Sequence, residues 1–95
     1  LSPVLRLAPP EIGYLDATLD YETLMERVTD YVQYTPVYNV SGAPAISLPL
    51  SMSADGLPIG AMFGAPVGRE DLLISLGFEM EEARPWAGRK PAIFG

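Results

Sequence analysis

The sequence of 95 residues contains no cysteine and no histidine. These absences exclude a disulfide scaffold, a thiol nucleophile, the usual structural zinc sites and Ser-His-Asp catalysis. Six basic side chains against twelve acidic ones leave a formal net charge of −6, which argues against a nucleic-acid partner and against a basic membrane-surface module. No apolar run approaches the roughly 20 residues of a membrane-spanning helix. With no disulfide to maintain, we expect a cytoplasmic protein.

The residues that are present favour one acidic, globular unit. Hydrophobic residues make up 48% of the chain, which is enough for one core but not for two domains. Ten prolines and nine glycines divide this apolar content into short runs. Such runs are typical of strands that lie against neighbours, and the chain opens on Leu1 instead of Met. We therefore expect a piece of a larger protein.

Two helices are predicted. Asp20 is a suitable N-cap, and apolar residues recur at helical spacing from Tyr21 to Val32. Pro36 should end this helix near Tyr34. A second helix is expected to start at Arg69 and to end at Pro85, with an apolar face made of Leu72, Leu73, Leu76, Met80 and Ala83. Gly77 inside this helix costs about 1 kcal/mol relative to alanine, which favours a close packing partner.

Strands are predicted in two regions. Residues 1–7 alternate in polarity and favour a short strand that ends at two prolines. Residues 45–52 also alternate, and Asp55-Gly56 is typical of a type I′ hairpin turn that leads to a return strand over residues 57–64. Pro49 cannot donate a ladder hydrogen bond, so it should lie at an edge or a bulge. Gly60 and Gly64 in the return strand would let another backbone come close.

No catalytic group stands out. None of the serines lies in a G-x-S-x-G elbow or an S-x-x-K motif, and Ser47 and Ser51 are expected on the polar face of a strand. The glycine-rich connection over residues 64–68 lacks phosphate-loop spacing, and acidic residues follow it at the helix N-terminus, where a phosphate would be repelled. The acidic residues of the second helix lack calcium-loop spacing. We therefore expect no metal and no cofactor.

Asn39 is the polar residue of most interest. Residues 35–44 are rich in turn formers, so we expect an irregular stretch there. In such a stretch an asparagine either closes an Asx turn or presents its amide to a ligand pocket. Both interpretations stay open on the residues alone.

The stretch from Asn39 to Pro49 reads N-V-S-G-A-P-A-I-S-L-P and resembles the C-terminal segment of the amidase-signature family. The family pattern is N-x-[ST]-G-x-P-A-x-S-x-P, followed by a turn that here reads Asp55-Gly56-Leu57-Pro58-Ile59-Gly60. The closing helix with Glu79, Glu82, Arg84, Pro85 and Trp86 is also similar to that family. The resemblance covers nearly the whole chain.

The resemblance implies an α/β fold: a fragment of a large mixed sheet covered by helices, with a β-hairpin and two flanking helices. It implies a parent enzyme that hydrolyses a linear or cyclic carboxamide with a Ser–cis-Ser–Lys triad and without metal or cofactor. That triad lies upstream of this segment, so no catalytic residue is assigned here. Asn39 would then lie near the active site. Tyr34 and Tyr38 either line the acyl pocket or are ordinary half-buried aromatic residues.

Two hypotheses follow. In the first, residues 1–95 are the C-terminal segment of an incomplete amidase domain, inactive alone, whose partners are an amide substrate and the missing N-terminal part of the same protein. In the second, the chain is a non-catalytic truncated homologue that binds or oligomerises. Strands cut from a large sheet leave open edges and apolar faces, so we also expect the 95-residue chain to self-associate.

Overall fold

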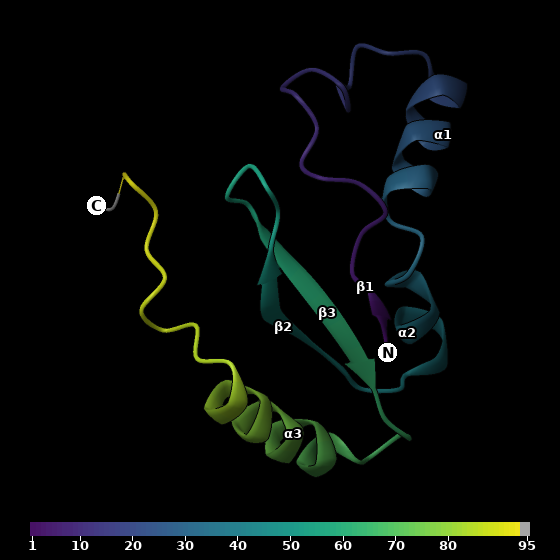
Figure 1. The fold of residues 1–95 in the computed structure, drawn as a ribbon. Helices are drawn as coiled ribbons and strands as arrows, with labels where there is room; N and C mark the ends of the chain where they lie inside the picture. The colour runs from purple at the N-terminus through teal and green to yellow at the C-terminus, as the bar shows by residue number, and fades with distance from the viewer. Residues whose placement is uncertain (94–95) are drawn as a thin grey trace.

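The computed structural model describes residues 1–93, which form three helices and three strands (Figure 1). In chain order these are β1 (Ser2–Pro3), α1 (Tyr21–Tyr31), α2 (Pro36–Ser41), β2 (Ala45–Met52), β3 (Pro58–Gly64) and α3 (Glu70–Ala83). The fold is α/β, and it contains the predicted hairpin with a helix before it and a helix after it. The short helix α2 is an addition that the sequence pattern does not predict.

The strands form one antiparallel sheet in the order β1-β3-β2. β2 and β3 pair from Ala45 opposite Gly64 to Met52 opposite Pro58, with an irregularity between Leu48 and Ser51. Pro49 falls in this irregular part of the edge strand, as expected for a residue that cannot donate a ladder hydrogen bond. These pairings place the carboxyl end of β3 beside the start of β2.

The loop between β2 and β3 is not the predicted type I′ turn. Gly56 has a φ of 81°, but no non-glycine residue of the described chain has a positive φ, so Asp55 lacks the conformation that type I′ requires. Gly56 N–H donates to Ser53 O over 3.0 Å, and Ser53 N–H donates to Leu57 O over 2.8 Å. These bonds are typical of a type I turn followed by a left-handed glycine. The longer loop needs only one left-handed residue, and glycine supplies it without strain.

β1 is shorter than the predicted strand over residues 1–7. Only Ser2 and Pro3 pair with β3, opposite Met62 and Ala61. The chain then leaves the sheet, and Arg6 N–H donates to Tyr31 O at the end of α1 over 3.2 Å. The Arg6 N–H, which a strand over residues 1–7 would have contained, therefore bonds to a helix end instead.

α1 is built largely as the sequence predicts. The carboxylate of Asp20 accepts a hydrogen bond from Thr23 N–H over 3.0 Å, as expected of an N-cap. The helix ends at Tyr31, before the predicted Tyr34, because Val32 already has non-helical φ and ψ of −103° and 42°. Arg6, from the segment after β1, forms an ion pair with Asp30 of α1.

The cap of α1 gives a pH prediction. The Thr23 N–H bond lowers the pKa of Asp20 below its ordinary value of 3.8, so the cap stabilises the fold fully above that value. This contribution is lost as the pH falls through the lower pKa of the folded state. Far-ultraviolet circular dichroism should show α1 losing helix in this acid range. Asp20→Asn, which caps without a charge, should lose less helix than the wild type over the same range; an identical acid titration would contradict the assignment.

α3 packs on one face of the hairpin at Gly77. A β-carbon at this position would lie 3.4 Å from Ile46 Cδ1 and 3.9 Å from Leu48 Cδ2, which confirms the predicted close packing partner. The core is small: Leu48, Met62 and Leu73 are buried, with exposed fractions of 5%, 4% and 6%. Most of the predicted apolar face of α3 is therefore not enclosed within the described chain.

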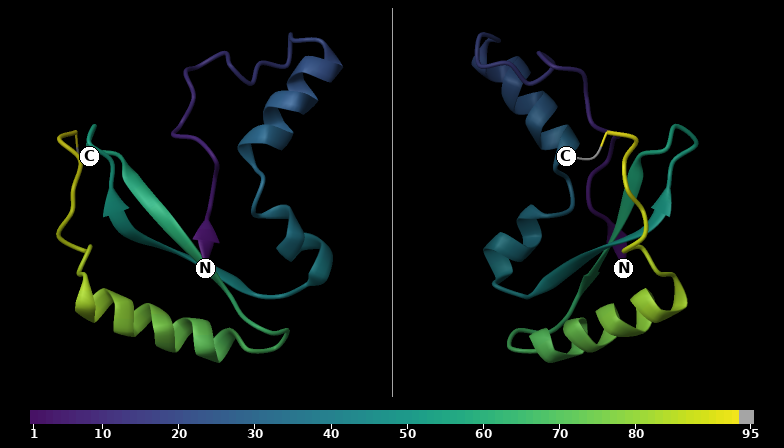
Figure 2. Two further views of the ribbon diagram at one scale, coloured as in Figure 1. Left: turned by 45° about the vertical axis from the view of Figure 1, so that its right-hand side comes forward. Right: turned by 90° about the vertical axis from the view of Figure 1, so that its left-hand side faces the viewer.

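Much apolar surface stays uncovered. The radius of gyration is 15.9 Å, whereas a compact chain of this length has about 12 Å. The accessible surface is 7100 Å², against about 5,400 Å² for a folded monomer of this mass. Figure 2 shows α1 and α3 at opposite ends of the molecule, with the sheet between them. The arrangement is typical of elements that belong to a larger folded body.

No helix within residues 1–93 combines the length and the apolar character that crossing a bilayer demands.

Candidate functional site

A shallow groove of about 370 Å³ lies where β1, α2 and the hairpin meet. Its floor includes Ser47 and Met62, which are cross-strand partners in β2 and β3. Because side chains alternate along a strand, this pair faces away from α3, which contacts the neighbouring Ile46 and Leu48. The groove is lined by Val4, Thr35, Tyr38, Asn39, Ala45, Ile46, Ser47 and Met62.

α2 brings two of these residues to the groove. Pro36 occupies the first turn, where its missing N–H costs nothing, and Gly42 ends the helix with a φ of 73°. Gly42 N–H donates to Tyr38 O over 3.0 Å, and Ala65 N–H donates to Pro44 O over 3.2 Å. The prediction of an irregular stretch over residues 35–44 is therefore wrong, because proline at the start and glycine at the end suffice to close a short helix.

Three uncharged polar residues line this groove: Asn39 and Ser47 are exposed, and Thr35 is half-buried. Within residues 1–93, neither the amide of Asn39 nor the hydroxyls of Thr35 and Ser47 form a hydrogen bond. The Asx-turn interpretation of Asn39 is wrong, because the residue lies inside α2 and its side chain bonds no backbone group. An amide and two hydroxyls offer both donors and acceptors, which is what a neutral carboxamide requires.

The groove contains no acid–base couple. No Asp, Glu, Lys or Arg side chain lines it. The chain's one lysine, Lys90, instead lines a separate hollow beside Trp86. Thr18 N–H lowers the pKa of Asp16, and the Arg69 guanidinium lowers the pKa of Asp71, but both carboxyls lie outside the groove. The groove can bind and orient a ligand, and it has no general base of its own.

The predicted site residues divide into two groups. Tyr38 and Asn39 line the groove, whereas Tyr34 does not. Sequence reasoning placed Ser47 only on a polar strand face, and it missed Thr35, Val4 and Met62 as lining residues. The glycines on either side of Met62 were the available signal, because they mark where other groups approach β3.

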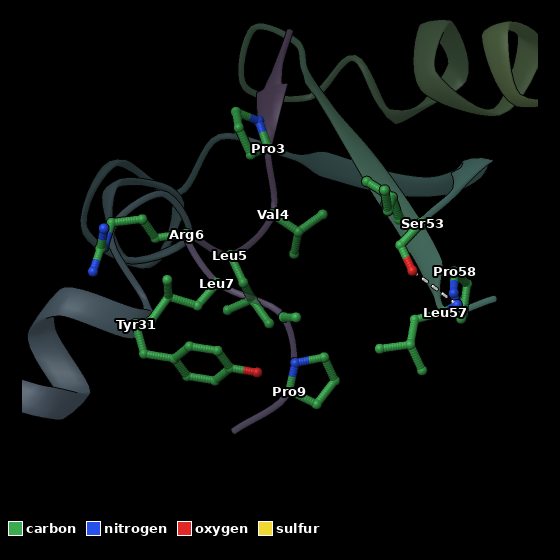
Figure 3. Close-up of a pocket in the computed structure, with 13 residues that line it drawn as sticks. Pro3, Val4, Leu5, Arg6, Leu7, Pro9, Tyr31, Ser53, Leu57 and Pro58 are labelled. Atoms are coloured by element: carbon green, nitrogen blue, oxygen red, sulfur yellow. Dashed lines mark hydrogen bonds between the residues drawn. The ribbon is translucent and has the colours of Figure 1, made fainter. Parts of the chain in front are cut away.

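A second hollow, of about 340 Å³, lies between the segment after β1 and the start of β3 (Figure 3). Figure 3 shows Leu5, Leu7 and Leu57 turned toward it. Two of its polar groups are already engaged: Ser53 Oγ accepts from Leu57 N–H over 3.0 Å, and Arg6 pairs with Asp30. This hollow therefore offers apolar surface and little chemistry.

No group of three or more acidic residues within residues 1–93 is arranged to hold a metal ion.

Comparison with known proteins gives a consistent family. The model of the family described as Amidase matches residues 1–74. A Mycobacterium tuberculosis protein that carries the amidase name AmiC is 55% identical over 87 residues, which cover 92% of this chain and 18% of that protein. The 6-aminohexanoate-cyclic-dimer hydrolase of Paenarthrobacter ureafaciens is 39% identical over 97 residues, covering 96% of this chain and 20% of that enzyme.

The solved structures agree. The structure of a 6-aminohexanoate cyclic dimer hydrolase superimposes with a TM-score of 0.80 at 39% identity, over 95% of this chain and 20% of that one. The same hydrolase complexed with substrate gives a TM-score of 0.81. This chain spans about one fifth of the length of these relatives.

Proposed function

The chain belongs to the amidase family, and from this premise we propose that it is the C-terminal segment of a hydrolase that cleaves a linear or cyclic carboxamide C–N bond. In this proposal residues 1–95 form part of one incomplete amidase domain. The rest of the polypeptide supplies a Ser–cis-Ser–Lys triad, and the chain alone is inactive. The substrate is a small-molecule amide, and its reaction uses no cofactor.

The role of this segment is to bind and orient the substrate. Asn39 can accept from an amide N–H through its side-chain oxygen and donate to an amide carbonyl through its NH₂ group. Tyr38 and Met62 supply apolar contact beside it. The observation that carries the proposal is the match of the Amidase family model to residues 1–74. The uncharged groove lined by Thr35, Asn39 and Ser47 is the place where this segment would contact an amide.

Replacing Asn39 tests this role in the longer polypeptide. Asn39→Ala should raise KM for a carboxamide about three- to tenfold, since one net hydrogen bond is lost, and should change kcat by less than about twofold. Val40→Ala is the matched control, because Val40 is the next residue of α2, is 90% exposed and does not line the groove. An unchanged KM in the Asn39 variant would contradict the role.

The 95-residue chain provides the second arm. We expect no turnover from it, because the groove has no general base that could activate a serine or threonine hydroxyl as a nucleophile. If the chain alone hydrolyses an amide and Ser47→Ala abolishes that activity, the proposal that the catalytic residues lie outside this segment is overturned. Tyr34 does not line the groove. In this proposal it contacts substrate only if the rest of the polypeptide extends the pocket to it. The cytoplasmic location stays a prediction.

A binding or oligomerising module is the second candidate. The large exposed apolar surface favours it. A longer polypeptide that binds amides without hydrolysing them would support this alternative over the first.

A further inference from the structure

Two glycines flank Met62 on the groove face of β3. Residues two apart along a strand point to the same face, so Gly60, Met62 and Gly64 form one row beneath the groove. Met62 is buried, with an exposed fraction of 4%. The positions on either side of it carry no side chain, although β3 would be stronger with one.

Each glycine makes room for a different wall of the groove. A β-carbon at Gly64 would lie 2.5 Å from Tyr38 Oη, 2.7 Å from Cε1 and 2.9 Å from Cζ. A β-carbon at Gly60 would lie 2.9 Å from Val4 Cγ2 and 2.8 Å from Ser47 Oγ. Val4 points toward the sheet in Figure 3. The Tyr38 ring and the Val4 side chain therefore rest on the backbone of β3 itself.

Four other glycines differ in kind. Gly13, Gly42, Gly56 and Gly68 have positive φ angles, and a β-carbon at any of them would meet nothing within 4 Å. Those four serve backbone conformation. Gly60 and Gly64 have no such φ angle, and a β-carbon at either would approach a side chain more closely than the 3.4 Å found at Gly77.

We propose that Gly60 and Gly64 are positioning residues that set the width of the groove for an amide substrate, by seating Val4 and Tyr38 directly on β3. The inference rests on the proposed function of the groove. Gly64 acts through Tyr38, which is adjacent to Asn39 in α2. Tyr38 and Asn39 line the same groove, so a Tyr38 ring displaced from β3 changes the space that a ligand of Asn39 occupies.

The test uses the longer polypeptide and three alanine variants. Gly64→Ala and Gly60→Ala should each raise KM for a carboxamide about tenfold with kcat changed by less than about twofold, since they alter binding geometry and not the reacting groups. Gly88→Ala is the matched control, because a β-carbon there meets open space, and it should leave both constants unchanged. KM values for Gly64→Ala and Gly60→Ala equal to that of Gly88→Ala would overturn the proposal.

A double variant covers the case in which Gly64→Ala fails to fold. Tyr38→Ala removes the ring that the new methyl group would strike, so Tyr38→Ala/Gly64→Ala should fold and should have the same KM as Tyr38→Ala alone. A double variant that is worse than Tyr38→Ala by a further tenfold would show that Gly64 does not act through Tyr38, which contradicts the proposal.

A measurement on the 95-residue chain separates this proposal from the proposed function. The ring current of Tyr38, whose hydroxyl end lies against Gly64, should shift the Gly64 α-proton resonances, and Tyr38→Leu should remove the shift. If the shift is present but Asn39→Ala leaves KM unchanged, Tyr38 does contact Gly64 but the groove does not bind the amide. The proposed function then fails, and the role of the glycines in setting the groove width fails with it. If Asn39→Ala raises KM but the resonance shift is absent, Tyr38 does not contact Gly64. The proposal for the two glycines then fails, and the proposed function stands.

Discussion

Leu73→Ala should lower the free energy of unfolding by about 3 kcal/mol, which is within the range for a buried leucine. Leu73 is one of three buried residues in the described chain, with an exposed fraction of 6%. Truncation leaves a cavity between α3 and the hairpin, and a core of this size has few other contacts to compensate. Urea unfolding followed by circular dichroism measures the change as a lower midpoint with a similar slope.

Leu72→Ala is the matched control. Leu72 precedes Leu73 in α3 and carries the same side chain, so helix propensity changes equally in both variants. It is 44% exposed, and we expect its loss to cost less than about 1 kcal/mol. Equal costs for the two variants in the 95-residue chain would contradict the packing of α3 on the hairpin.

The 95-residue chain should form dimers or larger oligomers at micromolar concentration. Its accessible surface exceeds that of a compact monomer of its mass by about 1,700 Å², and a stable dimer buries only about 800 Å² from each partner. α3 shows why: Leu73 faces the sheet, while Ile74 and Phe78 are 57% and 69% exposed on another face. Apolar residues therefore lie on a face of α3 that nothing in the described chain covers. Light scattering that reports a monomer would refute this prediction.

The outer face of α3 is the first surface to test. Ile74→Ser/Phe78→Ser should shift the light-scattering mass toward the monomer, because it removes the apolar stripe without touching Leu73. Ile12→Ser is the control, since Ile12 is fully exposed in the segment before α1, remote in sequence from α3, and should leave the oligomer unchanged. In the longer polypeptide the same double change should destabilise the fold instead, if other parts of that chain cover α3.

Local patterns determined several elements of this protein. The Asp20 cap, the apolar spacing that follows it and the alternation of residues 45–52 are each local in the chain, so α1 and the hairpin were predictable. The N-x-S-G-x-P-A-x-S-x-P stretch was enough to identify the family that the comparisons support. The close approach at Gly77 was predictable for the same reason, because an internal glycine lowers helix stability unless packing requires it.

Only the tertiary structure determined which residues come together to line the groove. Val4 is far from Tyr38 and Ser47 in the sequence, and their meeting depends on β1 pairing with β3, which no local pattern specifies. The end of β1 at Pro3 is decided by Arg6 N–H bonding to Tyr31 O, a contact between segments 25 residues apart. Leu72 and Leu73 are chemically identical neighbours, and only the direction from which the sheet approaches α3 makes one of them buried and leaves the other exposed. Sequence periodicity reports which residues are apolar, while burial depends on which other surface is there to cover them.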